Sequence, residues 1–294
     1  MRKSCCLNTL LLGESMLKSR KRLVIILSII AAIFVLVVLT SALFSLKNVE
    51  VVYSSVASEN SVVEGYKKDE IIKTGEFSYG KNILFLNYKS NIAKIEKAYP
   101  FAKVVKVERK FPNKAIVHIV ERQPVFKVQV GSTYYCLDSD LKILSDNVNF
   151  SSNLINFPTL LSFTIPEGKR AGDQLSNAHI RSVMTDIFAG VMGKQSNISI
   201  TSLKSINIST NEVTGEQEIT IINNNDEVKI ILEGSKNISA KIVCAYEVYN
   251  TKVQNSGLSE EDLKNTTITV SSGYKMGDSE SEGTFKVTVN GIKK

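Results

Sequence analysis

Three short motifs between residues 58 and 81 are the first candidates for catalysis. Residues 78–81 (SYGK) have the SxxK spacing, residues 73–75 read KTG, and residues 58–60 (SEN) resemble SxN. Acyl-transfer enzymes use such motifs to supply a serine nucleophile and the groups that move its proton. Here their order is reversed within one short stretch, and Ser78 is predicted to lie in a loop. We interpret them as chance matches and predict that the chain is not an enzyme.

The sequence also has no recognisable metal or cofactor motif. Its two histidines are His118, on a predicted strand, and His179, at a predicted helix start. Neither belongs to an HExxH or CxxC pattern, and no GxSxG, Walker A or GxGxxG string occurs. We therefore predict no catalytic residues, no metal site and no cofactor, and we interpret both histidines as structural.

The four cysteines do not form a disulfide framework. Cys5 and Cys6 precede an apolar segment, whereas Cys136 and Cys244 follow it, each within an apolar run. Such surroundings are typical of buried free thiols. A disulfide between Cys136 and Cys244 would require the fold to bring them together, which sequence spacing does not decide.

Residues 23–46 form an apolar segment without a charged side chain, LVIILSIIAAIFVLVVLTSALFSL. At about 1.5 Å per residue, a helix of this length crosses a hydrocarbon layer of about 30 Å. Four basic residues directly precede it, namely Lys18, Arg20, Lys21 and Arg22. The positive-inside rule then places residues 1–22 in the cytoplasm and the bulk of the chain outside. A cleaved signal peptide is the alternative, but signal cores run to about 7–15 residues, so we favour a retained single-pass anchor.

The net charge of +7 is unevenly distributed. Residues 1–22 hold six basic side chains and one acidic, residues 47–130 hold 15 and 9, and residues 131–294 hold 15 and 19. Without a basic helix or an aromatic platform interleaved with arginine, we predict no binding to nucleic acid. The excess in residues 47–130 could make weak contact with anionic lipid or wall polymer, although we favour a solvated lysine-rich surface as its explanation. Translation could begin at Met1 or at Met16, which is itself followed by a basic cluster and the anchor.

Residues 80–124 combine a helical period with two β-like runs. Apolar and aromatic residues at positions 88, 92, 95 and 99 share one helix face, with Asn87 as the predicted N-cap and Pro100 ending the helix. Residues 101–109 and 115–121 predict strands joined by a turn at 111–114, with Val105 and Val107 on an apolar face. Upstream, residues 46–53 predict a strand and residues 67–74 a helix stopped by Gly75. The predicted order is β-α-α-β-β.

This order and its motifs resemble the POTRA domain of the FtsQ/DivIB family of bacterial cell-division proteins. The motif string reads G-x-N-x-x-x-L-N, then a proline after the helix, V-x-V-x-R-x-x-P-N and E-R-x-P. The matching residues are Gly80, Asn82, Leu86, Asn87, Pro100, Val105, Val107, Arg109, Pro112, Asn113, Glu121, Arg122 and Pro124. One departure is the stretch 54–66, which is longer and more polar than the family's usual Gly-Asn turn after the first strand.

Beyond residue 124 the resemblance rests only on the order of the predicted helices and strands, which is similar to their order in the family's β domain. The predicted strands are residues 125–130, 133–137, 141–144, 203–209, 218–222, 228–232, 266–270 and 284–289. The predicted helices are residues 180–191 and 238–249, and 157–160 and 277–283 are predicted loops. The expected fold is therefore α+β, in five parts. These are a cytoplasmic tail (1–22), a transmembrane helix (23–46), a POTRA domain (47–124), a β domain (125–290) and a tail (291–294).

The resemblance implies a non-enzymatic scaffold at the division septum. It would bind FtsB/DivIC-like and FtsL-like membrane partners, with the lipid bilayer as a further partner, and would support septal peptidoglycan synthesis. In the family, the last strand region of the β domain receives a strand from the partner. Two segments with alternating polar and apolar residues could do so here. Their residues are Thr266, Thr267, Ile268, Thr269, Val270 and Ser271 in the first and Thr284, Phe285, Lys286, Val287, Thr288 and Val289 in the second.

In the family, a glycine precedes the alternating run of the terminal strand. This resemblance favours the second segment, which Gly283 directly precedes, with the outward-facing N–H expected at Lys286 or Thr288. Two other functions stay open from the sequence. A membrane-anchored wall enzyme would be revealed by covalent labelling of Ser78 with a β-lactam. A ligand-sensing ectodomain would need a cytoplasmic output, which a tail of 22 residues disfavours.

Overall fold

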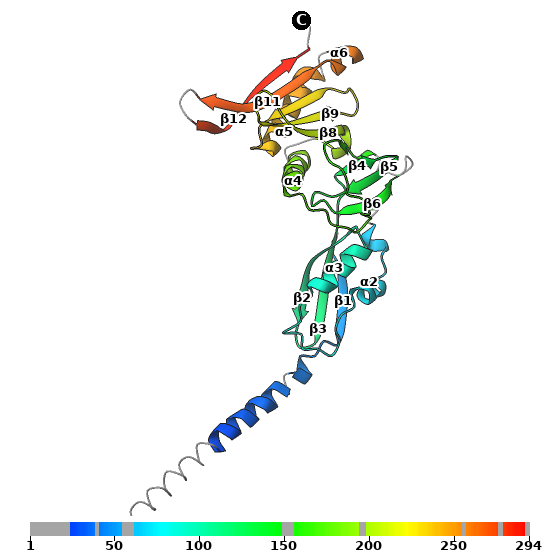
Figure 1. Cartoon of the computed structure of the whole chain (residues 1–294), viewed down its shortest axis with the longest axis vertical. Helices are drawn as coiled ribbons and strands as arrows, with labels where there is room; N and C mark the ends of the chain where they lie inside the picture. The colour runs from blue at the N-terminus through cyan, green and yellow to red at the C-terminus, as the bar shows by residue number, and fades with distance from the viewer. Residues whose placement is uncertain are drawn as a thin grey trace, which may run out of the picture. The chain divides into compact units, whose positions relative to one another are not determined.

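The computed structural model of the chain describes residues 24–38, 41–54, 62–148, 156–193, 198–254, 257–275 and 279–291. Contacts divide the chain into two compact units, and Figure 1 labels most of their helices and strands. The first unit contains the chain before residue 60, Glu64–Ile95 and Val104–Val120. The second contains Asn60–Val63, Glu96–Lys103 and everything from Glu121 onward.

Among the described residues, one apolar helix, Val24–Leu43, is long enough to cross a membrane, and its large apolar side chains are exposed. It ends three residues before the predicted boundary, because Ser45 already bridges to Asn82 and Leu46 is buried. Single-pass anchoring is consistent with this helix. The residues predicted to orient it (Lys18, Arg20, Lys21 and Arg22), and with them Cys5 and Cys6, lie outside the described part of the chain.

The first unit is built on a three-stranded sheet with the order β1-β3-β2, in which β1 runs parallel to β3. The predicted β-α-α-β-β order is confirmed, with a short 3-10 turn added before the first helix. The elements along this part of the chain are β1 (Asn48–Tyr53), η1 (Val63–Gly65), α2 (Lys68–Gly75), α3 (Lys89–Ala98), β2 (Ala102–Lys110) and β3 (Lys114–Glu121).

The ends of the two helices follow from local chemistry. Asn87 is confirmed as a cap of α3, since its Oδ1 accepts from Lys89 N at 3.1 Å. Gly75 does not stop α2 as predicted, because it is the last helical residue and Glu76 takes the left-handed conformation. Glycine is needed at 75 for space, since an added Cβ would lie 2.6 Å from the Phe77 ring.

The apolar face of β2 was assigned incorrectly from the sequence. Ala102 and Val104 are buried, whereas Val105 is 59% exposed and Val107 is only half-buried. Side chains alternate between the two faces of a strand, so a buried Val104 directs Val105 to the opposite face. The run of consecutive valines made both assignments compatible with the sequence.

The second unit contains a sheet whose strand order is β12-β11-β10-β9-β8-β7-β4-β5-β6. Its strands are β4 (Phe126–Val130), β5 (Thr133–Leu137), β6 (Ile143–Val148), β7 (Thr159–Leu160), β8 (Leu203–Thr210), β9 (Gln217–Asn223), β10 (Lys229–Glu233), β11 (Thr267–Lys275) and β12 (Ser279–Asn290). Its helices are α4 (Ala178–Met192), η3 (Ile200–Ser202), α5 (Ile238–Val248), the π-helical turn η4 (Tyr249–Val253) and α6 (Glu260–Lys264).

Helices α4 and α5 pack closely together and form the core with the sheet. The amphipathic helix predicted from its 3.6-residue period is confirmed, and Val183, Ile187 and Val191 on that face are buried. Gly190 permits the close approach of the two helices, because an added Cβ would lie 2.8 Å from Ser239 O.

Two predicted loops of the second unit are in fact paired as strands. Thr159 and Leu160 form β7, which is parallel to both β4 and β8 and joins the two halves of the sheet. A strand of two residues shows no period, so the sequence could not reveal it. Residues 279–283 belong to β12 despite their polarity, whereas residues 276–278 lie outside the described part of the chain.

Candidate functional site

One margin of the large sheet is formed by β12, which pairs with β11 in antiparallel register (Figure 1). The edge of β12 that faces away from β11 has no paired strand among the described residues. An edge strand presents unpaired backbone N–H and C=O groups that can pair with another chain. The first predicted segment, residues 266–271, is not such an edge, because β11 lies between β10 and β12. That alternative is wrong for strand addition.

The opposite margin of the sheet, formed by β6, is partly occupied. Ile143 exchanges backbone hydrogen bonds with the segment at 172–173, since its N donates to Asp173 O at 3.1 Å and its O accepts from Gly172 N at 2.8 Å. The Asp146 carboxylate accepts from Ala171 N at 3.1 Å. Of the two margins, β12 therefore offers the longer free edge in the described structure.

Hydrogen bonding on the inner side of β11 determines which groups of β11 face β12. Lys229 N on β10 donates to Thr266 O at 3.1 Å, so the backbone groups of Thr266 face β10. The backbone N–H and C=O groups of successive residues point to opposite sides of a strand. Because those of Thr266 face β10, the backbone groups of Thr267, Thr269 and Ser271 face β12.

The register then fixes the direction of the N–H groups on β12. Thr269 opposes Thr288, and Ser271 opposes Lys286. The N–H groups of Lys286 and Thr288 therefore point to β11, and the expected outward N–H at these positions is wrong. Phe285, Val287 and Val289 direct theirs to the open edge. The error arose because side-chain polarity does not report the direction of the backbone groups.

The side chains of β12 alternate as the sequence indicated. Phe285, Val287 and Val289 are half-buried against the core, whereas Lys286 and Thr288 are exposed. The side chain of Thr284 lies outside the described part of the structure. The free edge is thus held in place by apolar packing on one face of its strand.

Three motif residues of the first unit stabilise the connections around its sheet. Gly80 has a positive φ of 79° and donates its N–H to Leu46 O at 2.9 Å. Asn82 Oδ1 accepts from Leu84 N at 3.0 Å. Arg109 donates from Nη2 to Leu86 O at 2.7 Å. These contacts are structural, and none of them forms a binding site.

The other motif residues lie between elements or at their ends. Pro100 follows α3, Pro112 lies in the turn between β2 and β3, and Pro124 lies between β3 and β4. Glu121 accepts from Val62 N through Oε1 at 3.0 Å. The prolines therefore interrupt the helix and strands where the sequence predicted.

Arg122 is the centre of a buried charge cluster in the second unit. Its Nη1 lies 2.7 Å from Asp138 Oδ2 and 3.6 Å from Asp140 Oδ2, and its Nη2 lies 3.0 Å from Glu96 Oε2. Burial raises the pKa of Asp138 above its ordinary value even though Arg122 lies beside it. The hydrogen bond from Lys103 lowers the pKa of Asp140. Sequence reasoning found Arg122 only as a motif residue and gave no partner for it.

Removing Arg122 is expected to destabilise the chain strongly. Arg122→Met leaves the buried Asp138 carboxylate without its ion-pair partner, at a cost of about 3 kcal/mol of unfolding free energy. Adding Asp138→Asn removes the orphaned charge and should restore part of the loss. Thermal unfolding of the full chain measures both, with Arg170→Met, at an exposed arginine of the same unit, as control. Equal melting temperatures for the two arginine variants would contradict a special role for the cluster.

The residues considered for chemistry do not converge. Among the described residues, no three His, Cys, Asp or Glu side chains are grouped to hold a metal ion. His118 pairs with Glu108 at 2.9 Å, and His179 lies in α4. Ser78 lies in the irregular segment after α2 and not at a helix start. Cys136 and Cys244 are both free thiols, and burial raises the pKa of Cys136 to about 12.

Comparison with known proteins points to cell division. Residues 44–122 match the family model for the FtsQ-type POTRA domain. The chain is 28% identical to the cell division protein DivIB of Clostridium acetobutylicum over 182 residues, which cover 60% of this chain and 70% of that protein. It is 29% identical to DivIB of Clostridium tetani over 86 residues, which cover 29% of this chain and 32% of that protein. The motif string, the β-α-α-β-β fold and these matches together support the assignment of the chain to the FtsQ/DivIB family of cell-division proteins.

Proposed function

We propose that this division protein is a non-enzymatic scaffold of the septal machinery that captures a partner strand along the free edge of β12. The observation that carries the proposal is the open edge itself, with the N–H groups of Phe285, Val287 and Val289 directed outward. A partner strand would bond to these groups and extend the sheet, and side-chain contacts would select the partner. The expected partners are FtsB/DivIC-like and FtsL-like membrane proteins, and the outcome is support of septal peptidoglycan synthesis.

The apolar helix Val24–Leu43 supports the same proposal. An anchor in the membrane confines the POTRA domain (47–124) and the β domain (125–290) to the membrane surface. Confinement raises their effective concentration for partners anchored in the same membrane, so a modest strand-to-strand affinity is enough. Co-purification from crosslinked membranes tests the proposal. We expect small membrane-anchored division proteins to be recovered with the intact chain and lost when the β12 edge is blocked.

The proposed orientation places the N-terminus in the cytoplasm and both folded units outside, at the division septum. A reporter that is active only outside the cell, fused to the C-terminus, should therefore be active. Replacing Lys18, Arg20, Lys21 and Arg22 together with glutamine should lower that activity, because the positive charge that orients the helix is removed. A fusion that is active only with a cytoplasmic reporter would overturn the orientation.

A further inference from the structure

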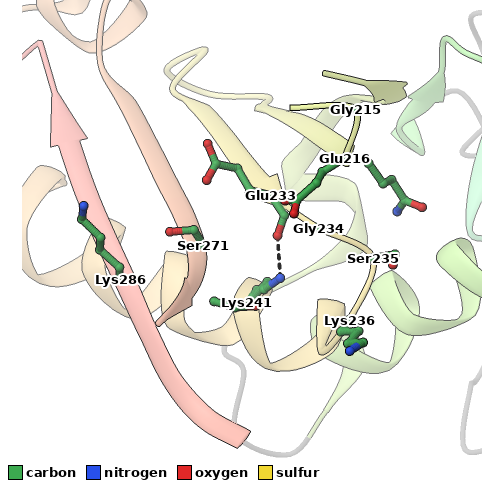
Figure 2. A pocket seen from close by; sticks show the side chains of 11 residues that line it. Gly215, Glu216, Glu233, Gly234, Ser235, Lys236, Lys241, Ser271 and Lys286 are labelled. Carbon is green, nitrogen blue, oxygen red and sulfur yellow. Dashed lines mark hydrogen bonds between the residues drawn. The ribbon is translucent and has the colours of Figure 1, made fainter. Parts of the chain in front are cut away.

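A polar cavity of about 760 Å³ lies in the second unit beside the ends of β9 and β10 (Figure 2). Parts of β11 and β12 complete its wall through Ser271, Ser272 and Lys286, and the loop at 234–236, which leads into α5, forms another side. Neither the family assignment nor the proposed strand addition gives this cavity a role.

Lys241 supplies a buried positive charge at the cavity. The residue is 0% exposed, and its Nζ donates to Glu233 O at 2.5 Å. Figure 2 shows the side chain extending from α5 to this carbonyl at the cavity wall. Gly234 follows with a positive φ of 79°, and an added Cβ there would lie 3.5 Å from Nζ, so the backbone turns directly beside the ammonium group. Burial disfavours the charged form of a lysine, whereas a negative charge close by stabilises it, so an anionic ligand beside Nζ would stabilise the ammonium group.

Gln217 supplies a hydrogen-bond donor that the described structure does not satisfy. Its Nε2 is buried and has no hydrogen-bond partner, and the residue lines the same cavity. A buried donor left unsatisfied costs about 1–3 kcal/mol. This nitrogen is closed off in the structure, so a ligand in the cavity reaches it only if the Gln217 side chain turns toward the cavity; an acceptor oxygen there would remove that cost and favours an oxygen-bearing ligand.

The remaining charges define the kind of acceptor. Lys236 and Lys286 are exposed and lie at the rim, whereas Glu216 and Glu233 contribute carboxylates to the same lining. Three lysines against two glutamates leave one net positive charge among the lining side chains. That balance matches the charge of a single carboxylate and would leave most of the charge of a polyanion, such as a phosphate cluster, unneutralised.

We propose that this cavity binds a carboxylate group, which accepts from Gln217 Nε2 beside the Lys241 ammonium group. The carboxylate can come from a free organic acid or from an acidic residue of a peptide. Binding does not depend on strand addition at β12, although Lys286 belongs to that strand. A chain blocked at the edge should therefore still bind the carboxylate.

The test uses the full chain in lipid nanodiscs and a blocked tripeptide with a central glutamate. Its control ligand is the same peptide with glutamine, which lacks the charge. Calorimetry should show binding of the glutamate peptide only, and Gln217→Leu should weaken it about tenfold, as expected for one lost charge-assisted hydrogen bond. The matched control Gln254→Leu, in a different pocket, should bind as the unchanged chain does.

Each outcome decides the proposal. Because Gln217→Leu removes an unsatisfied amide, its melting temperature should not fall; should it nevertheless misfold, the exposed Lys286→Met provides the second variant and should weaken binding several-fold. Competition by acetate would show that a free acid suffices, and its absence would assign the site to peptides. Equal binding of both peptides, no binding at all, or affinity unchanged in both variants would overturn the proposal.

Discussion

Val287→Pro is expected to abolish capture of the partner at β12, while Val287→Ala retains it. The N–H of Val287 faces the open edge, so proline removes a donor that only the partner strand uses and places its ring where that strand would lie. Both substitutions lose the same apolar packing against the core, which makes alanine a matched control. Recovery of the partner from crosslinked membranes is the measurement, with expression and thermal unfolding measured alongside.

Lys286→Pro provides the opposite case. The N–H of Lys286 faces β11, so proline at this position should disturb the β11–β12 pairing and lower the melting temperature, which Lys286→Ala should not do. If Val287→Pro captured the partner as well as Val287→Ala did, strand addition at this edge would be excluded. Retained capture with a normal melting temperature in Lys286→Pro would show that the assigned direction of the N–H groups is incorrect.

Ile95→Asp is expected to unfold the first unit or to cost about 5 kcal/mol, since it combines a lost apolar contact with an unpaired buried charge. Ile95 is 0% exposed. Val105→Asp introduces the same charge at a side chain that is 59% exposed and should stay within about 0.5 kcal/mol of the unchanged chain.

Thermal and denaturant unfolding of the full chain separate the two aspartate variants. A large loss in both would place Val105 in the core, as the sequence first suggested. Unchanged stability in both would mean that α3 does not pack where the structure has it.

The elements that the sequence predicted well are those with a sustained period or a strong local signal. The helix α4 shows six apolar positions at amphipathic spacing between residues 180 and 191, and the strands β2 and β3 are separated by a proline turn. The short strand β7, the π-helical turn at Tyr249–Val253 and the small helix α6 were missed. Their structure depends on neighbours that are distant in sequence, which local patterns do not encode.

The candidate site was only partly predictable for a related reason. Alternation along residues 285–289 indicated a half-buried strand, but it could not show that β11 is enclosed while β12 lies at the margin. That distinction comes from the parallel pairing of Thr267 with Lys229, two residues far apart in the chain. The buried partners of Arg122 and the unsatisfied amide of Gln217 are likewise products of tertiary packing.

The unequal margins of the large sheet have a consequence for stoichiometry. A sheet with two free edges can propagate into a fibre, because every added copy exposes a new acceptor. Here the β6 margin is engaged at Ile143 by the segment at 172–173, so extension proceeds from β12. Two copies joined edge to edge through β12 would consume both acceptors and form a closed pair. Under the proposed strand addition, one partner strand per chain would therefore fill the longer free edge and leave no comparable edge for a further copy.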